Sequence, residues 1–249
     1  TSGTAVYNFA PAVAEACFSK TPLLIFTADR PTEWIGQQDG QTIYQENIFG
    51  KHVKRSFQLP QDYEHPDSMW AINRIVNEAI NEAHAHPQGP VHINAPFREP
   101  LYPNASEDFT YTKSVRTIEP AQSELSLAKG LRKQLAKELE GYNKVLMVAG
   151  QQTYHEPTAK LLEQVCCKHN LPLAGDVISN LHLVEDLIRH ADLFLGQATD
   201  EIRKSLQPEL LITFGESLIS KNLKLFLRQF PAQAHWHIQP AGIPADSFQ

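Results

Sequence analysis

The chain has 249 residues, with 22 Lys and Arg against 28 Asp and Glu, which gives a formal net charge of -6 at pH 7. At roughly 150 residues per domain, this length predicts about two domains, each able to bury its own core. The negative charge and the absence of a clustered Lys/Arg stripe argue against binding to nucleic acid or to an anionic membrane surface.

No apolar stretch approaches the roughly 18 residues of a membrane span, and the first residues show no signal-peptide pattern. The cysteines Cys17, Cys166 and Cys167 form no CxxC pair, and the adjacent Cys166 and Cys167, on a predicted amphipathic helix, are expected to be buried, reduced thiols. These features together predict a cytoplasmic protein.

Helices and strands are predicted to alternate in the amino-terminal part. Apolar residues at helical spacing occupy 9–17, and the most regular amphipathic helix covers 72–83. The short apolar runs 22–26 and 91–94 are typical of parallel strands, and the first is expected to be buried on both faces. Residues 34–45 are polar and predict a loop over the strand ends.

The carboxyl-terminal part repeats this alternation after a polar stretch at 102–124, which predicts an interdomain linker. Predicted helices and strands then follow in the order 125–135 (helix), 145–149 (strand), 161–166 (helix), 210–214 (strand), 223–230 (helix) and 235–238 (strand). The predicted fold class is therefore α/β, with two domains, 1–101 and 125–249, each a parallel sheet flanked by helices. The second domain looks Rossmann-like, yet no GxGxxG or Walker sequence follows its strands.

The segment Thr27-Ala28-Asp29-Arg30-Pro31 ends the predicted strand at 22–26 with charge and a proline. Ligands of open parallel sheets bind just beyond the carboxyl ends of the strands. The planar fork of Arg30 would there match a carboxylate or a phosphate in bidentate fashion. The alternative is a surface arginine paired with Asp29 or Glu33, and this segment alone does not choose between the two.

Other chemical motifs are not found in the sequence. His155-Glu156 is not followed by a second histidine at HExxH spacing, and the 11 histidines are scattered, so no metal ligand is predicted. Neither Ser2 nor Ser217 lies in GxSxG, which argues against a hydrolase elbow.

Four segments together resemble the thiamine diphosphate enzymes, and within them the family of 2-succinyl-5-enolpyruvyl-6-hydroxy-3-cyclohexene-1-carboxylate (SEPHCHC) synthases of menaquinone biosynthesis. They are 1–5, 27–31 with Gln41 eleven residues after the arginine, 89–101, and 214–221. The Gly-Pro-Val strand in 89–101 is common to many thiamine diphosphate enzymes. The Ala-Asp-Arg-Pro turn followed by Gln41 is much more characteristic of the synthase family.

The resemblance implies that 1–101 is the carboxyl-terminal part of a pyrimidine-binding domain and 125–249 a central Rossmann-like domain, and that the start of the first domain and the whole diphosphate-binding domain are lacking. It also implies roles for particular residues. Thr1, Ser2 and Gly3 would lie near the pyrimidine ring of the cofactor. Arg30 and Lys221 would bind substrate carboxylates, and Gln41 would contact the cofactor or the adduct on the substrate side of the site. Without the resemblance, Lys221 would be one more solvated helix lysine, like Lys224.

The resemblance also implies an enzyme that uses thiamine diphosphate and Mg²⁺, decarboxylates 2-oxoglutarate and adds the succinyl unit to isochorismate, as a homodimer or homotetramer. Neither the family's activating glutamate nor its Gly-Asp-Gly diphosphate motif is found in the sequence. We therefore expect a fragment with no catalytic residue of its own, inactive when alone.

Two alternatives remain open at the level of the sequence. Another thiamine diphosphate enzyme, of the acetolactate synthase or 2-oxo acid decarboxylase type, would share the Gly-Pro-Val strand and the central domain. A noncatalytic regulatory module would instead bind a pathway metabolite in the central domain.

Overall fold

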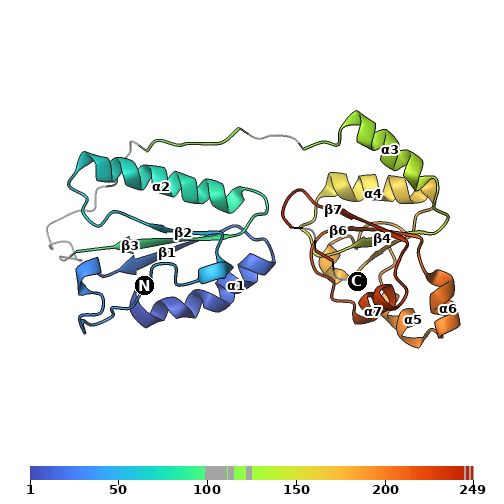
Figure 1. The fold of residues 1–249 in the computed structure, drawn as a ribbon, viewed down its shortest axis with the longest axis horizontal. Coiled ribbons are helices and arrows are strands. Elements are labelled where there is room, and N and C mark those ends of the chain that lie inside the picture. Colours follow the sequence, from blue (N-terminus) through green and yellow to red (C-terminus); the bar gives the residue numbers. More distant parts are fainter. Residues whose placement is uncertain (99–110, 112–114, 122–124, 244, 247, 249) are drawn as a thin grey trace. The chain divides into compact units, whose positions relative to one another are not determined.

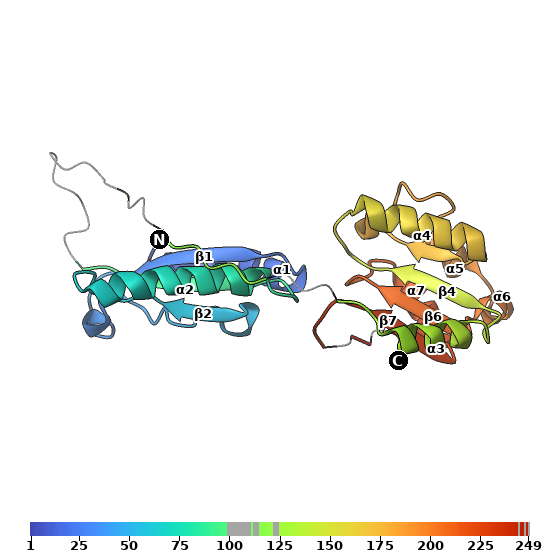
Figure 2. The same ribbon diagram turned by 90° about the horizontal axis from the view of Figure 1, so that it is seen from above.

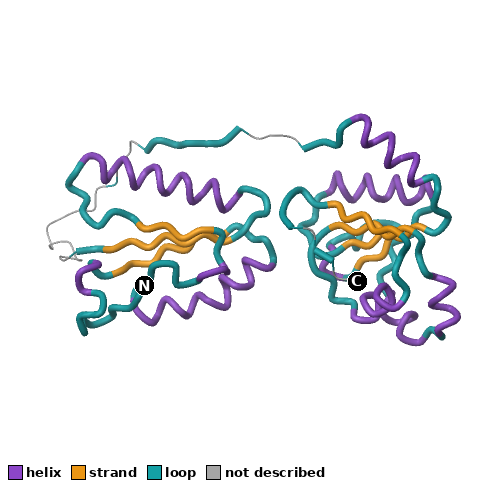
Figure 3. The backbone as a smooth tube through the Cα atoms, in the orientation of Figure 1, coloured by secondary structure: helices purple, strands orange, loops and turns teal. Residues whose placement is uncertain are grey.

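A computed structural model describes residues 1–98, 111, 115–121, 125–243, 245, 246 and 248. The chain divides into two compact units, Thr1–Ser123 and Glu124–Gln249, each a parallel sheet with helices on its faces (Figure 1; Figure 3). The predicted α/β class is therefore confirmed. The domain limits 1–101 and 125–249 stay predictions, because much of 102–124 lies outside the described residues.

The first unit contains a three-stranded sheet in the order β1-β3-β2. Its elements are η1 (Gly3–Phe9), α1 (Ala10–Phe18), β1 (Leu23–Asp29), η2 (Thr32–Trp34), η3 (Gly50–His52), β2 (Arg55–Gln58), α2 (Pro66–His84) and β3 (Pro90–Pro96). Both strand pairs are parallel, and α1 and α2 lie on opposite faces of the sheet (Figure 1). The four-residue strand β2 was not predicted, because it is too short for a clear period.

The core of this unit consists of two apolar clusters, one on each face of the sheet. The cluster on the α1 side includes Val6, Val13 and Ile25. The cluster on the α2 side includes Val91 and Ile93. Both clusters contain further apolar residues.

The prediction that strand 22–26 is buried on both faces is wrong for Phe26, whose side chain is 50% exposed. β1 is an edge strand, and α2 packs mainly over the central strand β3.

Residues 115–121, inside the predicted linker, run along α2 (Figure 2). The Asn77 amide donates to the Arg116 carbonyl at 2.9 Å and accepts from the Ile118 N–H at 2.7 Å. One turn further on, Asn81 donates to the Ile118 carbonyl at 2.8 Å. This part of the segment is therefore hydrogen-bonded to the first unit.

The second unit contains a four-stranded parallel sheet in the order β5-β4-β6-β7. Its elements are α3 (Lys129–Leu139), β4 (Val145–Ala149), α4 (Glu156–His169), β5 (Leu173–Gly175), η4 (Val177–Ser179), α5 (Ala191–Gln197), α6 (Asp200–Leu206), β6 (Leu210–Phe214), α7 (Lys221–Gln229) and β7 (Ala234–Ile238). One face of this sheet packs against α4 and the other against α5 and α7, in two apolar clusters (Figure 1).

The predicted strands of this unit are confirmed, and its three predicted helices are present. The helix expected from Leu125 begins only at Lys129, and both Leu125 and Leu127 are exposed ahead of it. β5, α5 and α6 were not predicted, because three to seven residues are too few to reveal a period.

The cysteine prediction is only partly right. All three thiols are free, but Cys167 is exposed and Cys17 and Cys166 are half-buried. Among the described helices, none is both long and apolar enough to cross a bilayer.

Candidate functional site

The carboxyl ends of β1 and β3 gather most of the residues that the sequence points to. Ala28, near the end of β1, donates its N–H to the Thr1 carbonyl at 3.0 Å. The Gly3 N–H is held by the side-chain oxygen of Gln45 at 2.6 Å. The Thr1–Gly3 turn therefore lies against the strand end that leads into Arg30.

Gln41 packs directly onto this turn. Gly3 has a φ of +65°, and a Cβ placed on it would lie 3.1 Å from the Gln41 carbonyl oxygen. Ser2 Oγ also donates to Gln41 Oε1 at 3.3 Å. A side chain at Gly3 would be strained and crowded, so glycine allows the loop to close over the turn. The structure thus brings Thr1, Ser2, Gly3 and Gln41 together.

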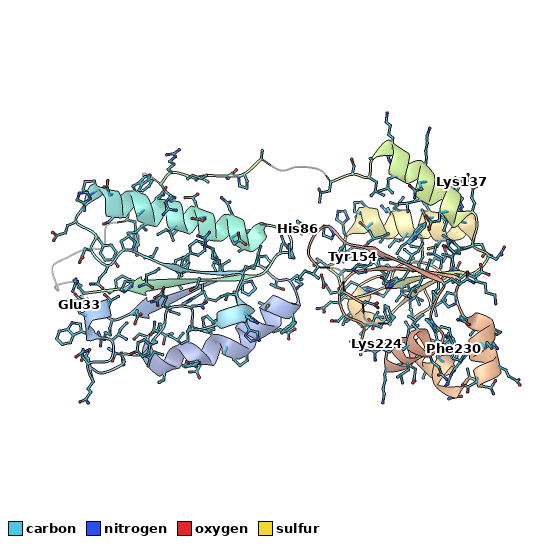
Figure 4. All side chains as sticks on the ribbon, viewed as in Figure 1. Glu33, His86, Lys137, Tyr154, Lys224 and Phe230 are labelled. Carbon is cyan, nitrogen blue, oxygen red and sulfur yellow. The ribbon has the colours of Figure 1, made fainter. Side chains whose placement is uncertain are left out.

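Arg30 follows β1 at the same edge, and its guanidinium has no hydrogen bond or ion pair with any described residue. Its Nε is buried without a partner. Only its backbone N–H is engaged, donating to Asp29 Oδ1 at 2.8 Å. Glu33, labelled at this edge in Figure 4, pairs instead with Arg98 at 2.6 Å. The guanidinium of Arg30 therefore forms no ion pair with Asp29 or Glu33, which was the alternative interpretation.

A buried polar network lies beneath these residues. Asn94 on β3 is 1% exposed and Gln45 is 0% exposed. Gln45 Nε2 donates to the Ala28 carbonyl at 2.8 Å and to Asn94 Oδ1 at 3.0 Å. Asn94 Nδ2 donates to Asp29 Oδ2 at 2.7 Å. Because buried polar groups are costly when unpaired, such a network fixes the relative positions of its members.

His92 extends the network to the neighbouring strand. The Thr27 hydroxyl donates to Asn94 Oδ1 at 2.8 Å, so its oxygen accepts from His92 Nε2, 2.7 Å away. His92 Nδ1 then accepts from the Ser56 hydroxyl at 3.0 Å, which assigns a neutral imidazole protonated on Nε2. Burial lowers the pKa of His92 to about 4.

Burial acts in the opposite sense on Asp29, which is 4% exposed. It raises the pKa of the Asp29 carboxyl, while the hydrogen bonds from Asn94 and from the Arg30 N–H lower it in part. The edge therefore carries a hydrogen-bonded carboxyl group with a raised pKa, next to an arginine whose guanidinium has no partner among the described residues.

Lys221 belongs to the second unit, so it is not among the residues gathered at β1. It is the first residue of α7, whose N-cap is Ser220. Asp176 Oδ2, after β5, accepts the Ile219 and Ser220 N–H groups at 2.6 and 3.2 Å, which holds the segment leading to Lys221. Lys221 itself is exposed, whereas Lys224, labelled in Figure 4, donates to the Leu218 carbonyl at 3.0 Å.

The sequence-based reading missed Gln45, Asn94 and His92 as members of the site. Gln45 could have been noticed because it lies one helical turn's spacing after Gln41, on the same loop. Asn94 and His92 could have been noticed because they are polar residues inside an otherwise apolar strand, where an unpaired polar group would be unfavourable. Across the described residues, no three His, Cys, Asp or Glu side chains lie close enough to hold a metal ion.

Comparison with known proteins gives three findings. A family model described as "Middle domain of thiamine pyrophosphate" matches residues 133–248. The SEPHCHC synthase of Cytophaga hutchinsonii is 41% identical over 249 residues, which are 100% of this chain and 44% of that protein. The synthase of the same name from Phocaeicola vulgatus is 39% identical over 248 residues, which are 43% of its length.

A solved structure has a similar fold. It is a putative thiamin diphosphate-dependent enzyme from Mycobacterium smegmatis, with a TM-score of 0.53 and 15% identity, covering 86% of this chain and 39% of that one. At this identity the likeness concerns the fold alone. The chain spans less than half the length of the curated relatives that it matches.

Proposed function

We propose that this chain is part of a SEPHCHC synthase, because it is similar along its whole length to two such synthases and because residues 133–248 match a family model of the middle domain of thiamine pyrophosphate enzymes. The whole protein then decarboxylates 2-oxoglutarate and adds the succinyl unit to isochorismate, with thiamine diphosphate and Mg²⁺, as a homodimer or homotetramer. The observation within the structure that supports this best is the unpartnered guanidinium of Arg30 at a strand end.

Both substrates are dicarboxylates, and this gives each cationic residue a task. Arg30 binds one carboxylate through its fork, because a guanidinium without a protein partner is free to form two parallel hydrogen bonds. Lys221 binds another carboxylate as a point charge. Gln41 contributes an amide next to the Thr1–Gly3 turn, on the substrate side of the cofactor.

The residues present fit one part of the cofactor. Within the Thr1–Gly3 turn, Thr1 is exposed and Ser2 is half-buried, so a flat ring could approach their backbone at the strand ends. Gly3 is buried beneath Gln41 and holds the turn in place. No set of metal ligands occurs in the part of the chain that the structure describes, so no residue here is assigned to Mg²⁺ or to the diphosphate. When bound, the cofactor supplies the electron sink for decarboxylation. The chain's own residues bind and orient the substrates.

We further expect that the 249-residue chain alone neither consumes 2-oxoglutarate nor binds thiamine diphosphate tightly. Affinity for a long cofactor is built from contacts at both of its ends, and the residues assigned here contact only one. Isothermal titration calorimetry of the purified chain tests this, and low-micromolar binding of thiamine diphosphate would contradict it.

Release of CO₂ from 2-oxoglutarate by the full-length protein tests the proposed reaction. The release should require thiamine diphosphate, and it should be accompanied by consumption of isochorismate and formation of its succinyl adduct. The regulatory alternative makes a different prediction, namely that the 249-residue chain binds a menaquinone-pathway intermediate in calorimetry while the full-length protein shows no turnover.

A further inference from the structure

One buried side chain, Asn94, connects Arg30 to the Thr1–Gly3 turn. On one side, Asn94 Nδ2 donates to Asp29 Oδ2 at 2.7 Å, and Asp29 Oδ1 accepts the Arg30 N–H at 2.8 Å. On the other side, Asn94 Oδ1 accepts from Gln45 Nε2 at 3.0 Å, and Gln45 Oε1 accepts the Gly3 N–H at 2.6 Å. A continuous chain of hydrogen bonds therefore runs between two segments that are 27 residues apart in sequence.

The hydrogen-bonding capacity of Asn94 is fully used. Its oxygen also accepts from the Thr27 hydroxyl at 2.8 Å, and its nitrogen also donates to Gln58 Oε1 at 3.0 Å. A primary amide has two donor hydrogens and an oxygen with two lone pairs, so all four positions are occupied. With 1% of its surface exposed, Asn94 has no solvent to replace any of these partners. The amide orientation is thereby fixed, and with it the strand end that carries Arg30.

From this geometry we infer that Asn94 is a positioning residue: it sets the backbone of Arg30 through Asp29 and the Thr1–Gly3 turn through Gln45. Its amide is occupied by protein partners and is buried, so it has no position left for a substrate or cofactor. The expected effect of Asn94 on catalysis rests on the proposed function. Its effect on the backbone amides of Arg30 and Gly3 does not, because the exchange of these amides can be measured without turnover.

The substitution Asn94→Asp in the full-length protein tests the inference. It keeps an oxygen for Thr27 and Gln45, but it replaces the donor to Asp29 and Gln58 by a second carboxylate oxygen. The Gln58 amide can rotate to donate to this oxygen, whereas the carboxylates at 29 and 94 repel each other. We expect amide exchange at Arg30 and Gly3 to speed up at least tenfold, and kcat/KM for 2-oxoglutarate to fall at least tenfold, mainly through KM. Both effects should lessen at lower pH, where the two carboxyls share a proton.

A second variant tests whether exchanging the donor at 94 with the acceptor at 29 restores the hydrogen bond between them. In the double variant Asp29→Asn/Asn94→Asp, the amide at position 29 can donate to the carboxylate at 94 and can still accept the Arg30 N–H. Protection of the Arg30 amide and KM should therefore recover most of the way, which independent structural damage at two sites would not produce.

Asn77→Asp is the matched control, because Asn77 is another buried amide of the same unit, 9% exposed, which holds the backbone of Arg116 and Ile118. It should lower the melting temperature with no change in KM or in exchange at Arg30 and Gly3. If Asn94→Asp behaves like this control, or if the double variant is no better than the single one, the positioning role is wrong. If the wild-type protein forms no product, the proposed function fails, and the amide exchange still decides the role of Asn94.

Discussion

Arg30 is the residue of the candidate site with the clearest unmet hydrogen-bonding capacity. Its Nε is buried, and no described residue accepts a hydrogen bond from its guanidinium. Arg30 is only half-buried as a whole, but a buried N–H without an acceptor is unfavourable, and a bound carboxylate would supply the missing acceptor. This is the physical basis for assigning it to a substrate carboxylate.

Replacing Arg30 by lysine in the full-length protein should therefore reduce activity although the charge is kept. Lysine cannot make the two parallel hydrogen bonds of a guanidinium fork, so we expect at least a tenfold fall in kcat/KM for one of the two substrates, equivalent to about 1.4 kcal/mol. Steady-state kinetics with each substrate varied in turn measures this. Arg132→Lys, at an exposed position of α3, is the control. Wild-type kinetics for Arg30→Lys would mean that the arginine binds no substrate.

His92 makes stability depend on acidity. Its pKa is lowered to about 4 from an ordinary value of 6.5. Between these two pH values, His92 is therefore mostly neutral in the folded state and mostly protonated in the unfolded state. The stability contributed by neutral His92 is therefore fully present above pH 6.5 and is lost as the pH falls toward 4. At about 1.4 kcal/mol per pKa unit, the loss amounts to roughly 3 kcal/mol at most.

Urea denaturation of the wild type and of His92→Gln at a series of pH values isolates this effect. The difference in unfolding free energy should favour the wild type at pH 7 and should shrink between pH 6.5 and 4, because glutamine does not titrate. His84→Gln, at an exposed position at the end of α2, should show no such trend. A constant difference across this range would show that His92 is not kept neutral by burial.

Only some residues of the candidate site could be predicted from the sequence. The Ala-Asp-Arg-Pro turn was correctly placed at the end of a strand, because charge and proline after an apolar run indicate a strand end, and its role in binding stays a prediction. Gln45 and Asn94 could not be assigned in the same way, because their roles depend on partners 42 and 65 residues away in sequence. Long-range hydrogen bonds leave no local pattern.

At the scale of elements, the ends of β4 and β6 approach each other unusually closely. A Cβ placed on Gly150 would lie 2.2 Å from the Glu216 carbonyl oxygen, and one on Gly215 would lie 2.8 Å from the Gly150 carbonyl oxygen. Both obstacles are backbone atoms, which cannot move away as a flexible side chain would. Gly150 and Gly215, which follow these two predicted strands, are therefore needed because the backbone segments there pack too closely for any side chain.

Gly150→Ala should accordingly destabilise the second unit by about 1–3 kcal/mol or more, as overpacking does. Trp236 in β7 reports on this unit, so urea denaturation followed by its fluorescence, with Trp34 and Trp70 of the first unit replaced by Phe, measures the effect. Gly130→Ala, whose Cβ would meet nothing within 4 Å in α3, is the control and should be neutral or slightly stabilising. Equal stability of the two variants would contradict the close approach.

Elements with a long hydrophobic period were predictable, and short ones were not. The 19-residue helix α2 and the five-residue strands β4 and β6 have clear apolar patterns. β5 has three residues and depends on pairing with β4 rather than on its own sequence. The exposure of Phe26 was missed for a related reason, since a run of apolar residues does not reveal whether its strand is central or at an edge.

At the scale of the whole molecule, the two units differ in the number of strands and in the size of their buried apolar clusters. The first has three strands and an edge strand, β1, that exposes Phe26, whereas the second has four strands and two larger apolar clusters. Local stability follows buried apolar contacts. In the 249-residue chain, the first unit should therefore be the less stable one, and its uncovered apolar surface should favour self-association.

Hydrogen exchange measures this difference within one sample. Amides of 23–26 in β1 should exchange faster than those of 145–148 in β4. Equal protection of the two strands in a strictly monomeric sample would show that the first unit is stable by itself.

The central claim is that the full-length protein joins a succinyl unit from 2-oxoglutarate to isochorismate, and a competition assay tests it most directly. The protein is supplied with thiamine diphosphate, Mg²⁺, isochorismate and equal concentrations of 2-oxoglutarate and pyruvate, and the products are identified by mass spectrometry. We predict the succinyl adduct of isochorismate as the main product, formed only when thiamine diphosphate is present. Acetolactate as the main product, or no thiamine-dependent product, would contradict the claim.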